Sequence, residues 1–232
     1  MTQIRERLLA LRDAPYAAFQ RRLIPNIAPE RIIGVRTPAL RALARELTGT
    51  AQAEAFLAVL PHELFEENQL HAFLLERQRD FPQCLAAVED FLPFVDNWAT
   101  CDQLCPPCFV RHAGELRAPA RRMMADAHPY TVRYGLGLLM RFYLDERFEP
   151  GVLEEAAAVQ SEEYYVRMMV AWLFASALDK QADAALPYVA EERLEPWTRR
   201  KAIQKALESR RIDEGQKAEL RAIRARLNEE NI

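Results

Sequence analysis

The chain consists of segments with helical hydrophobic periodicity, separated at short intervals by proline and glycine. Apolar residues recur every three or four positions, as in Leu136, Leu139, Met140 and Tyr143, and no stretch alternates as a half-buried strand does. The pieces between breaks are about 10 to 18 residues long, which is a plausible length for one helix each. Breaks of this kind include Pro61, Pro82, Pro93, Pro106, Pro107, Pro129, Pro150 and Pro196.

The longer helices are predicted to begin at nearly regular intervals. Their expected starts are near Thr37, Glu66, Asn97, Pro129, Glu163 and Pro196, with a shorter helix before most of them. A period of about thirty residues is typical of helical-pair repeats. One pair cannot bury its own apolar face, so the pairs must stack. The sequence therefore predicts an all-α solenoid, an α-α superhelix with a concave groove, formed by residues 1–232 as a single domain.

Composition agrees with a folded, helical chain. Only 7 of the 232 residues are glycine, 50% are hydrophobic and 28% are charged, a balance that favours helix and is too apolar for a disordered protein. No run approaches the roughly 18 apolar residues of a membrane span. Residues 1–6 lack the basic start and apolar run of a signal peptide. We therefore expect a cytoplasmic protein without membrane contact.

Charge is unevenly distributed along the sequence. The formal net charge is −3 and the pI is about 5.9, so the total does not suggest a nucleic-acid partner. Residues 193–211, however, hold seven bases and two acids, whereas residues 54–102 hold two bases and ten acids. Together with a basic N-terminal arm, the basic segment could grip phosphates. The alternative is that its arginines only keep polar helix faces soluble.

Cysteine and histidine spacing raises the question of a metal. Cys101, Cys105 and Cys108 have the spacing of a radical-SAM iron-sulfur motif, and His112 would complete a Cys3His zinc set. Such a cluster loop follows a strand in a barrel, and this chain shows no strands. The residues before Cys105 look helical, and the two prolines after it force an extended turn. We expect free thiols, with no metal and no cofactor.

Other catalytic motifs are missing from the sequence. It contains no glycine-rich phosphate loop, no zincin His-Glu pair and no nucleophile elbow. His71 and His128 are interpreted as helix-surface or helix-start residues. The acidic pair Glu66 and Glu67 is placed at a helix start, where acids interact favourably with the helix dipole.

One pair of residues suggests a site. Trp98 and Asp102 are four positions apart, so on a helix they share one face, and a flat ring beside an anion could cradle a cation. The alternative is a core tryptophan with a solvated or capping aspartate. Arg133 lies early in the next long helix and Trp172 midway along the one after it. If three consecutive inner helices line one groove, these four side chains converge on a patch with two aromatic walls, an anion and a phosphate-binding fork.

Together these residues resemble the AlkD-like DNA alkylation-repair family, alkylpurine DNA glycosylases built from HEAT-like helical repeats. The resemblance covers nearly the whole chain, and the order and spacing of its motifs carry it. The motifs are the run Gly34–Arg41, Asn97-Trp98 with Asp102, Val132-Arg133, the segment from Glu163 to Val166 leading to Ala171-Trp172, and the run Trp197–Ile203.

The resemblance implies that the chain excises positively charged bases such as N3-methyladenine and N7-methylguanine from double-stranded DNA carrying alkylated bases. It assigns Asp102 as the catalytic carboxylate, Trp98 and Trp172 as the lesion-facing rings, and Arg133 as a phosphate contact. We expect further DNA contacts from Arg167, Arg199, Arg200, Lys201 and Lys205, and we expect the protein to be a monomer. It would act on a lesion that stays stacked in the duplex.

Two other functions remain open at this point. One is a non-catalytic module of the same fold that binds distorted or branched DNA through backbone contacts. The other is a protein-protein scaffold with no DNA role, which the acidic pI favours. Steep weakening of duplex binding with salt is expected for the glycosylase and for the DNA-binding module, but not for the protein-protein scaffold.

Overall fold

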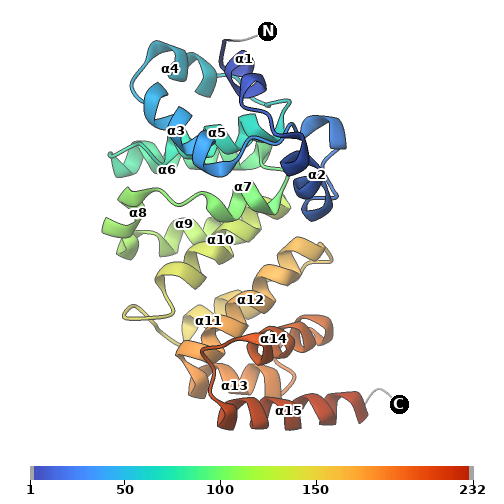
Figure 1. The fold of residues 1–232 in the computed structure, drawn as a ribbon. Helices are drawn as coiled ribbons and strands as arrows, with labels where there is room; N and C mark the ends of the chain where they lie inside the picture. Colours follow the sequence, from blue (N-terminus) through green and yellow to red (C-terminus); the bar gives the residue numbers. More distant parts are fainter. Residues whose placement is uncertain (1–2, 230–232) are drawn as a thin grey trace. The chain divides into compact units, whose positions relative to one another are not determined.

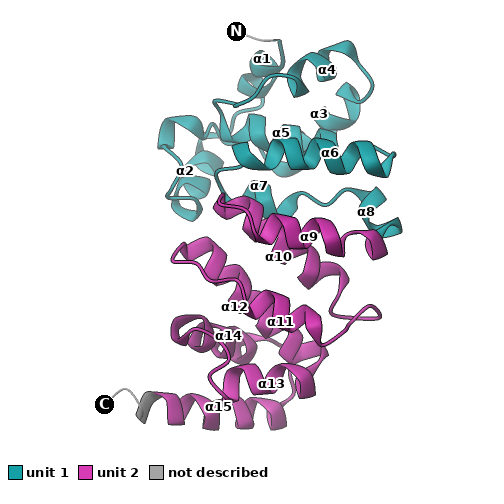
Figure 2. Cartoon of the chain, turned by 180° about the vertical axis from the view of Figure 1, so that it is seen from behind, with its two compact units in different colours: residues 1–112 teal, residues 113–232 magenta. Residues whose placement is uncertain are grey.

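The structure is a computed structural model that describes residues 3–229, and all its regular elements in that range are helices (Figure 1). The contacts divide the chain into two compact units, residues 1–112 and 113–232 (Figure 2). The all-α helical-repeat fold predicted from the sequence is confirmed. That the units form one continuous domain stays a prediction.

The six predicted helix starts are observed within one residue. The corresponding helices are α3 (Thr37–Leu47), α5 (Phe65–Leu75), α7 (Trp98–Gln103), α10 (Pro129–Phe142), α12 (Tyr164–Lys180) and α14 (Pro196–Glu208). Three of them begin with proline at the first or second position, where the missing N–H costs nothing. The predicted length is wrong for α7, which has only six residues. Pro106 and Pro107 disfavour helical backbone in the residues just before them, so the helix ends at Gln103.

In unit 1, α5 is the central helix. All eleven of its residues are buried, and it packs against α1, α3, α4, α6 and α7. A helix that is buried on every side must satisfy its polar groups internally. The remaining elements of the unit are α1 (Gln3–Ala10), α2 (Ala14–Leu23), η1 (Pro29–Arg31), α4 (Ala51–Leu57), α6 (Phe81–Phe91), η2 (Leu92–Phe94) and α8 (Pro107–Arg111).

In unit 2, α10, α12 and α14 pack side by side in chain order, and each also contacts the shorter helix that precedes it. This pairing is the repeat that the sequence period predicts. The shorter helices are α9 (Arg117–Met124), α11 (Gly151–Ala157) and α13 (Ala182–Ala190), and the unit also contains η3 (Ala113–Glu115) and α15 (Glu214–Glu229). Among the described residues, no helix has both the length and the hydrophobicity needed to cross a bilayer.

Candidate active site

Helix α7 carries Trp98 and Asp102 in unit 1. Asn97 caps its start, because the Asn97 side-chain oxygen accepts a hydrogen bond from the Thr100 N–H at 2.8 Å. The buried Thr100 hydroxyl in turn accepts one from Gln69 Nε2 of α5 at 3.3 Å. The predicted helix is therefore present, and its 3.6-residue turn places Trp98 and Asp102 on one face.

Trp98 is half-buried rather than free in solvent. Its ring packs against the apolar cluster that Ile24, Ile27, Ile32 and Phe65 form with two alanines. Its indole N–H donates to the Leu23 carbonyl at the end of α2, at 3.2 Å. This bond fixes the plane of the ring. Asp102 is also half-buried, one helical turn further along α7.

Trp172 occupies a different environment in unit 2. Its ring is 38% exposed on α12 and lines a cavity of about 500 Å³. The cavity is also lined by Met140 of α10, Asp179 of α12 and Lys205 of α14. The Lys205 ammonium lies 5.8 Å from the centre of the Trp172 ring, within range of a cation-π contact. Unit 2 thus brings together two of the predicted site residues, an aromatic ring and a base.

Arg133 is buried at the start of α10. Only 4% of the residue is exposed, and its Nη1 donates to the Tyr165 carbonyl in the first turn of α12 at 2.6 Å. The guanidinium therefore joins α10 to α12. Its phosphate contact stays a prediction.

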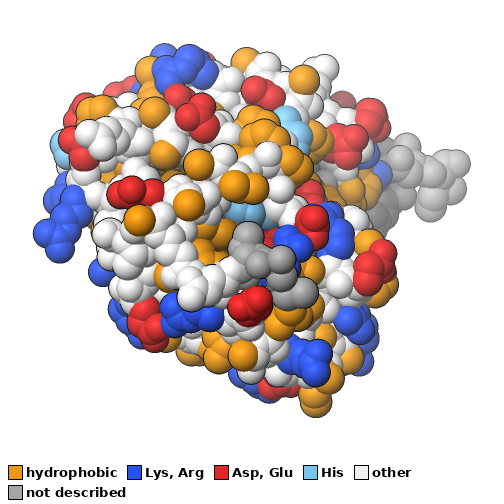
Figure 3. All heavy atoms as spheres, turned by 90° about the horizontal axis from the view of Figure 1, so that it is seen from above, with side chains coloured by type: hydrophobic (Ala, Val, Ile, Leu, Met, Phe, Trp, Pro, Cys, Tyr) orange, Lys and Arg blue, Asp and Glu red, His pale blue; other side chains and the backbone are white. Residues whose placement is uncertain are grey.

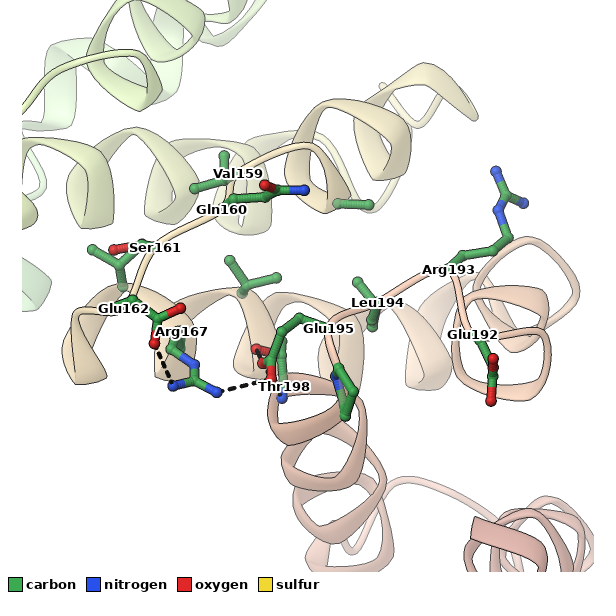
Figure 4. A pocket seen from close by; sticks show the side chains of 14 residues that line it. Val159, Gln160, Ser161, Glu162, Arg167, Glu192, Arg193, Leu194, Glu195 and Thr198 are labelled. Carbon is green, nitrogen blue, oxygen red and sulfur yellow. Dashed lines mark hydrogen bonds and ion pairs between the residues drawn. The ribbon is translucent and has the colours of Figure 1, made fainter. Parts of the chain in front are cut away.

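Arg167 lies in a pocket of about 450 Å³ beside the loops that precede α12 and α14 (Figure 4). Its guanidinium bridges two carboxylates, with Nη1 3.5 Å from Glu162 Oε2 and Nη2 2.9 Å from Glu195 Oε1. It also stacks over the Trp197 ring at 4.7 Å. These contacts link the two loops. The two carboxylates also neutralise the positive charge with which Arg167 would bind a phosphate.

Glu195 is the N-cap of α14. Its carboxylate accepts hydrogen bonds from the N–H groups of Trp197 and Thr198, at 2.9 and 3.0 Å. Burial raises its pKa, but these N–H groups and Arg167 outweigh that effect and lower the pKa to about 2. The carboxylate therefore occupies the helix end that would otherwise attract an anion.

The basic segment after Glu195 divides into buried and exposed cations. Arg199 is 6% exposed, and its guanidinium donates to the carbonyls of Val189 and Ala190 at the end of α13, at 2.7 and 3.2 Å. It acts as a C-terminal cap of that helix. Arg200 is exposed, and Lys201 and Lys205 are half-buried. The DNA-contact role of Arg199 stays a prediction.

The cysteines are free thiols. Cys101 and Cys108 are buried and Cys105 is half-buried, while Cys84 is buried and interacts with Cys108. His112 stacks on Phe81 with 4.6 Å between ring centres. In the part of the chain that the structure describes, no three metal-ligating side chains are grouped so that they could hold an ion.

Comparison with known proteins identifies the family. A family model described as DNA alkylation repair enzyme matches residues 4–206, nearly the full length of the chain. The chain belongs to the DNA alkylation repair enzyme family. A search of curated proteins found no match. The family resemblance predicted from the sequence motifs is confirmed, and with it a role in alkylation repair.

In this DNA alkylation repair enzyme, several residues contact the two ends of α7, and the sequence pattern did not identify them. Arg31 and Asn26 contact Asp96, the residue before the N-cap, and Glu76 contacts Cys105, two residues after the helix. Only the capping asparagine left a local signal in the sequence. The other contacts join residues 29 to 70 positions apart, and no local pattern encodes them.

The surface of this repair enzyme is mixed in charge where Figure 3 shows it. Acidic and basic side chains alternate with apolar ones on that face, and neither sign covers it continuously. This face is therefore neither uniformly acidic nor uniformly basic.

Proposed function

We propose that this alkylation repair enzyme is a monofunctional DNA glycosylase that excises cationic N-alkylated purines, such as N3-methyladenine and N7-methylguanine, from duplex DNA. The observation that carries the proposal is the placement of Trp98 and Asp102 on one face of α7. It is supported by the family match across residues 4–206.

The chemistry suits these side chains. An alkylated purine already carries a positive charge, so its glycosidic bond is weak and needs little acid catalysis. As the bond breaks, its electron pair goes to the base and neutralises it, and the sugar acquires oxocarbenium character. The Asp102 carboxylate stabilises this developing charge and orients the water that adds to C1′ and loses a proton. No metal or cofactor takes part in the proposed step.

The aromatic rings and the bases have separate roles in the proposal. Trp98 and Trp172 present ring faces to the positive sugar. Arg200, Lys201, Lys205 and Arg133 bind phosphates. The convergence of the residues of unit 1 with those of unit 2 on one lesion is part of the proposal. So are the monomeric state and the cytoplasmic location.

The test is release of methylated bases from a methylated duplex, measured by chromatography under single-turnover conditions. We expect release by the wild-type protein and a loss on the order of 100- to 1,000-fold in Asp102→Asn, with the duplex Kd unchanged. Asp90→Asn, at an exposed aspartate of α6 in the same unit as Asp102, should retain activity.

Two other outcomes would each select an alternative function. Salt-dependent duplex binding without base release would indicate a non-catalytic module for distorted or branched DNA. The absence of both binding and release would leave a protein-protein scaffold. Either result would overturn the glycosylase proposal.

A further inference from the structure

Helix α7 is too short to hold its own position. Six residues form little more than one and a half turns, and an isolated helix of that length is unstable in water. Its neighbours must therefore fix it in place. Two polar anchors do so, one at each end, and both involve arginines from the segment between α2 and the end of α3.

The first anchor is Asp96, just before the helix. Its carboxylate accepts Arg31 Nη1 at 2.7 Å and the Asn97 side-chain amide at 3.0 Å. Its backbone carbonyl accepts Asn26 Nδ2 at 2.7 Å. Arg31 is itself held, because its Nε donates to the Glu63 carbonyl at 2.7 Å. The start of α7 is thus fixed to the loop that follows α2.

The second anchor is Glu76, the C-cap residue directly after α5. Its side chain is 10% exposed, and its Oε1 accepts the Cys105 backbone N–H at 3.1 Å. Its Oε2 pairs with Arg41 Nη1 at 2.6 Å. The Arg41 guanidinium also lies over the Phe73 ring at 4.1 Å. The chain leaving α7 is thus fixed to α5 and α3.

The segment that supplies both arginines is locked to α5 by a buried carboxylate. Glu66 accepts the backbone N–H groups of Ile33, Gly34 and Val35, at 3.2, 2.6 and 3.3 Å. Gly34 has φ +86°, and a Cβ there would lie 2.2 Å from the Asp13 carbonyl oxygen, so only glycine allows this backbone. The run Gly34–Arg41 therefore has a positioning role that its sequence does not reveal.

We propose that Glu76 and Asp96, with their partners Arg41 and Arg31, are positioning residues that hold α7 so that Trp98 and Asp102 meet the lesion. The inference rests on the proposed function of α7. A displacement of about 1 Å in a catalytic group costs on the order of 100-fold in rate. Loss of an anchor therefore lowers the rate of base release and leaves the affinity for DNA unchanged.

The experiment compares Glu76→Leu with Glu76→Gln, which keeps an oxygen for the Cys105 N–H. Asp96→Leu and Asp96→Asn form a second pair at the other end of α7. The matched control is Glu155→Leu in unit 2, since Glu155 is also a largely buried carboxylate, paired with Arg117 at 2.8 Å. Single-turnover base release, duplex Kd and Tm are measured for each.

We expect both leucine variants to lose on the order of 10- to 100-fold in release rate, with Kd within about twofold of wild type. The amide variants should recover most of the rate. Glu155→Leu should lower Tm without lowering the rate. The proposal is overturned if the leucine variants keep the wild-type rate, or if Glu155→Leu lowers the rate as much as they do.

A second readout does not depend on catalysis. The protein has three tryptophans, so replacing Trp172 and Trp197 with phenylalanine leaves Trp98 as the single emitter. Glu76→Leu and Asp96→Leu should shift Trp98 emission to the red and increase its quenching by iodide, and Glu155→Leu should not. If the wild type releases no base, the proposed function fails, and this emission alone decides whether the anchors hold α7.

Discussion

The two helices that carry the candidate site are held in place by different forces. Helix α12 has seventeen residues, nine of them buried, and packs against α10, α11, α13 and α14. Helix α7 has six residues, three of them buried, and depends on the hydrogen bonds and ion pairs at its two ends. Apolar packing thus positions Trp172, whereas the position of Trp98 and Asp102 depends on polar anchors at the two ends of α7 and on the packing of the Trp98 ring.

Because of this difference, we expect substitutions around the two helices to differ in their effects on stability and on the rate of base release. A long, buried helix tolerates the loss of one exposed ring, because its core remains. A short anchored helix can shift without unfolding the unit, so its polar anchors affect catalysis more than they affect folding, whereas Trp98, which packs against an apolar cluster, affects both. The following predictions test this contrast, from the largest expected effect to the smallest.

The two tryptophans should respond differently to truncation. Trp98→Ala removes packing against the apolar cluster and the bond to the Leu23 carbonyl, and should lower the free energy of unfolding by about 2–3 kcal/mol. Trp172→Ala should cost about 1 kcal/mol or less, since the ring is largely outside the core. Both should lose about tenfold in base release, the value of a desolvated cation-π contact. Chemical denaturation and single-turnover release measure these effects.

Phenylalanine variants sharpen the comparison. Trp98→Phe should recover much of the packing but not the hydrogen bond, and Trp172→Phe should recover most of the release rate. Equal losses of stability for the two alanine variants would contradict the contrast between the helices.

Unit 1 should be the more acid-labile unit because of His62 and His71. The two rings contact each other, with 2.9 Å between His62 Nε2 and His71 Nδ1, and both are buried. Burial lowers the pKa of His62 to about 4 and that of His71 to about 3. Nearby Glu67 raises the His62 pKa and Arg5 lowers it. In the unfolded chain both rings take up protons near pH 6.5.

Between the pKa values of the histidines in the folded protein and their pKa in the unfolded chain, the unfolded chain binds more protons. The free energy of unfolding therefore rises with pH in this range. From about pH 6 down to about pH 4, each histidine should lower the free energy of unfolding by about 1.4 kcal/mol per pH unit. The double variant His62→Asn, His71→Leu should flatten this slope, whereas His128→Asn in unit 2 should not. Denaturation midpoints measured at several pH values test this, and identical slopes for all three proteins would refute it.

The last comparison, within the basic segment of unit 2, includes the smallest change in stability. Arg199→Ala should cost about 2 kcal/mol of stability, because two carbonyls of α13 lose their donor. Lys205→Ala should leave stability nearly unchanged, weaken duplex binding severalfold and reduce the slope of log K against log salt by about 0.9. Binding titrations at several salt concentrations and thermal melts distinguish them. If Arg199→Ala instead reduces the salt slope and keeps normal stability, Arg199 contacts DNA phosphate and its role as a cap of α13 is wrong.

The helices could be predicted well from the sequence because their determinants are local. Proline at the first turn and apolar residues at intervals of three and four located six helix starts within one residue. The regular helix period predicts a long α7, which is wrong, because Pro106 and Pro107 end the helix early. The helix-surface position predicted for His71 is also wrong, since a single histidine in a helical pattern does not reveal that α5 is covered on all sides.

The site could be predicted only in part. The spacing of Trp98 and Asp102 indicated their shared face, since it depends on helix geometry alone. The environment of each cation could not be predicted, because burial is a tertiary property. Arg199 and Lys205 lie six residues apart on one helix, yet one caps α13 and the other faces the Trp172 ring. Glu66 lies in the first turn of α5 as predicted, but the sequence did not show that its carboxylate also accepts hydrogen bonds from the three backbone N–H groups of residues 33–35.

The most direct test of the central claim is a crystal structure of the Asp102→Asn variant bound to a duplex that contains 3-methyl-3-deazaadenine, a stable, uncharged analogue in which carbon replaces N3. We predict that the sugar C1′ of this nucleotide lies within about 4 Å of the residue-102 side chain, in van der Waals contact, with Trp98 and Trp172 facing the same sugar. A duplex bound on another face, with residue 102 and both rings away from the modified nucleotide, would contradict the account.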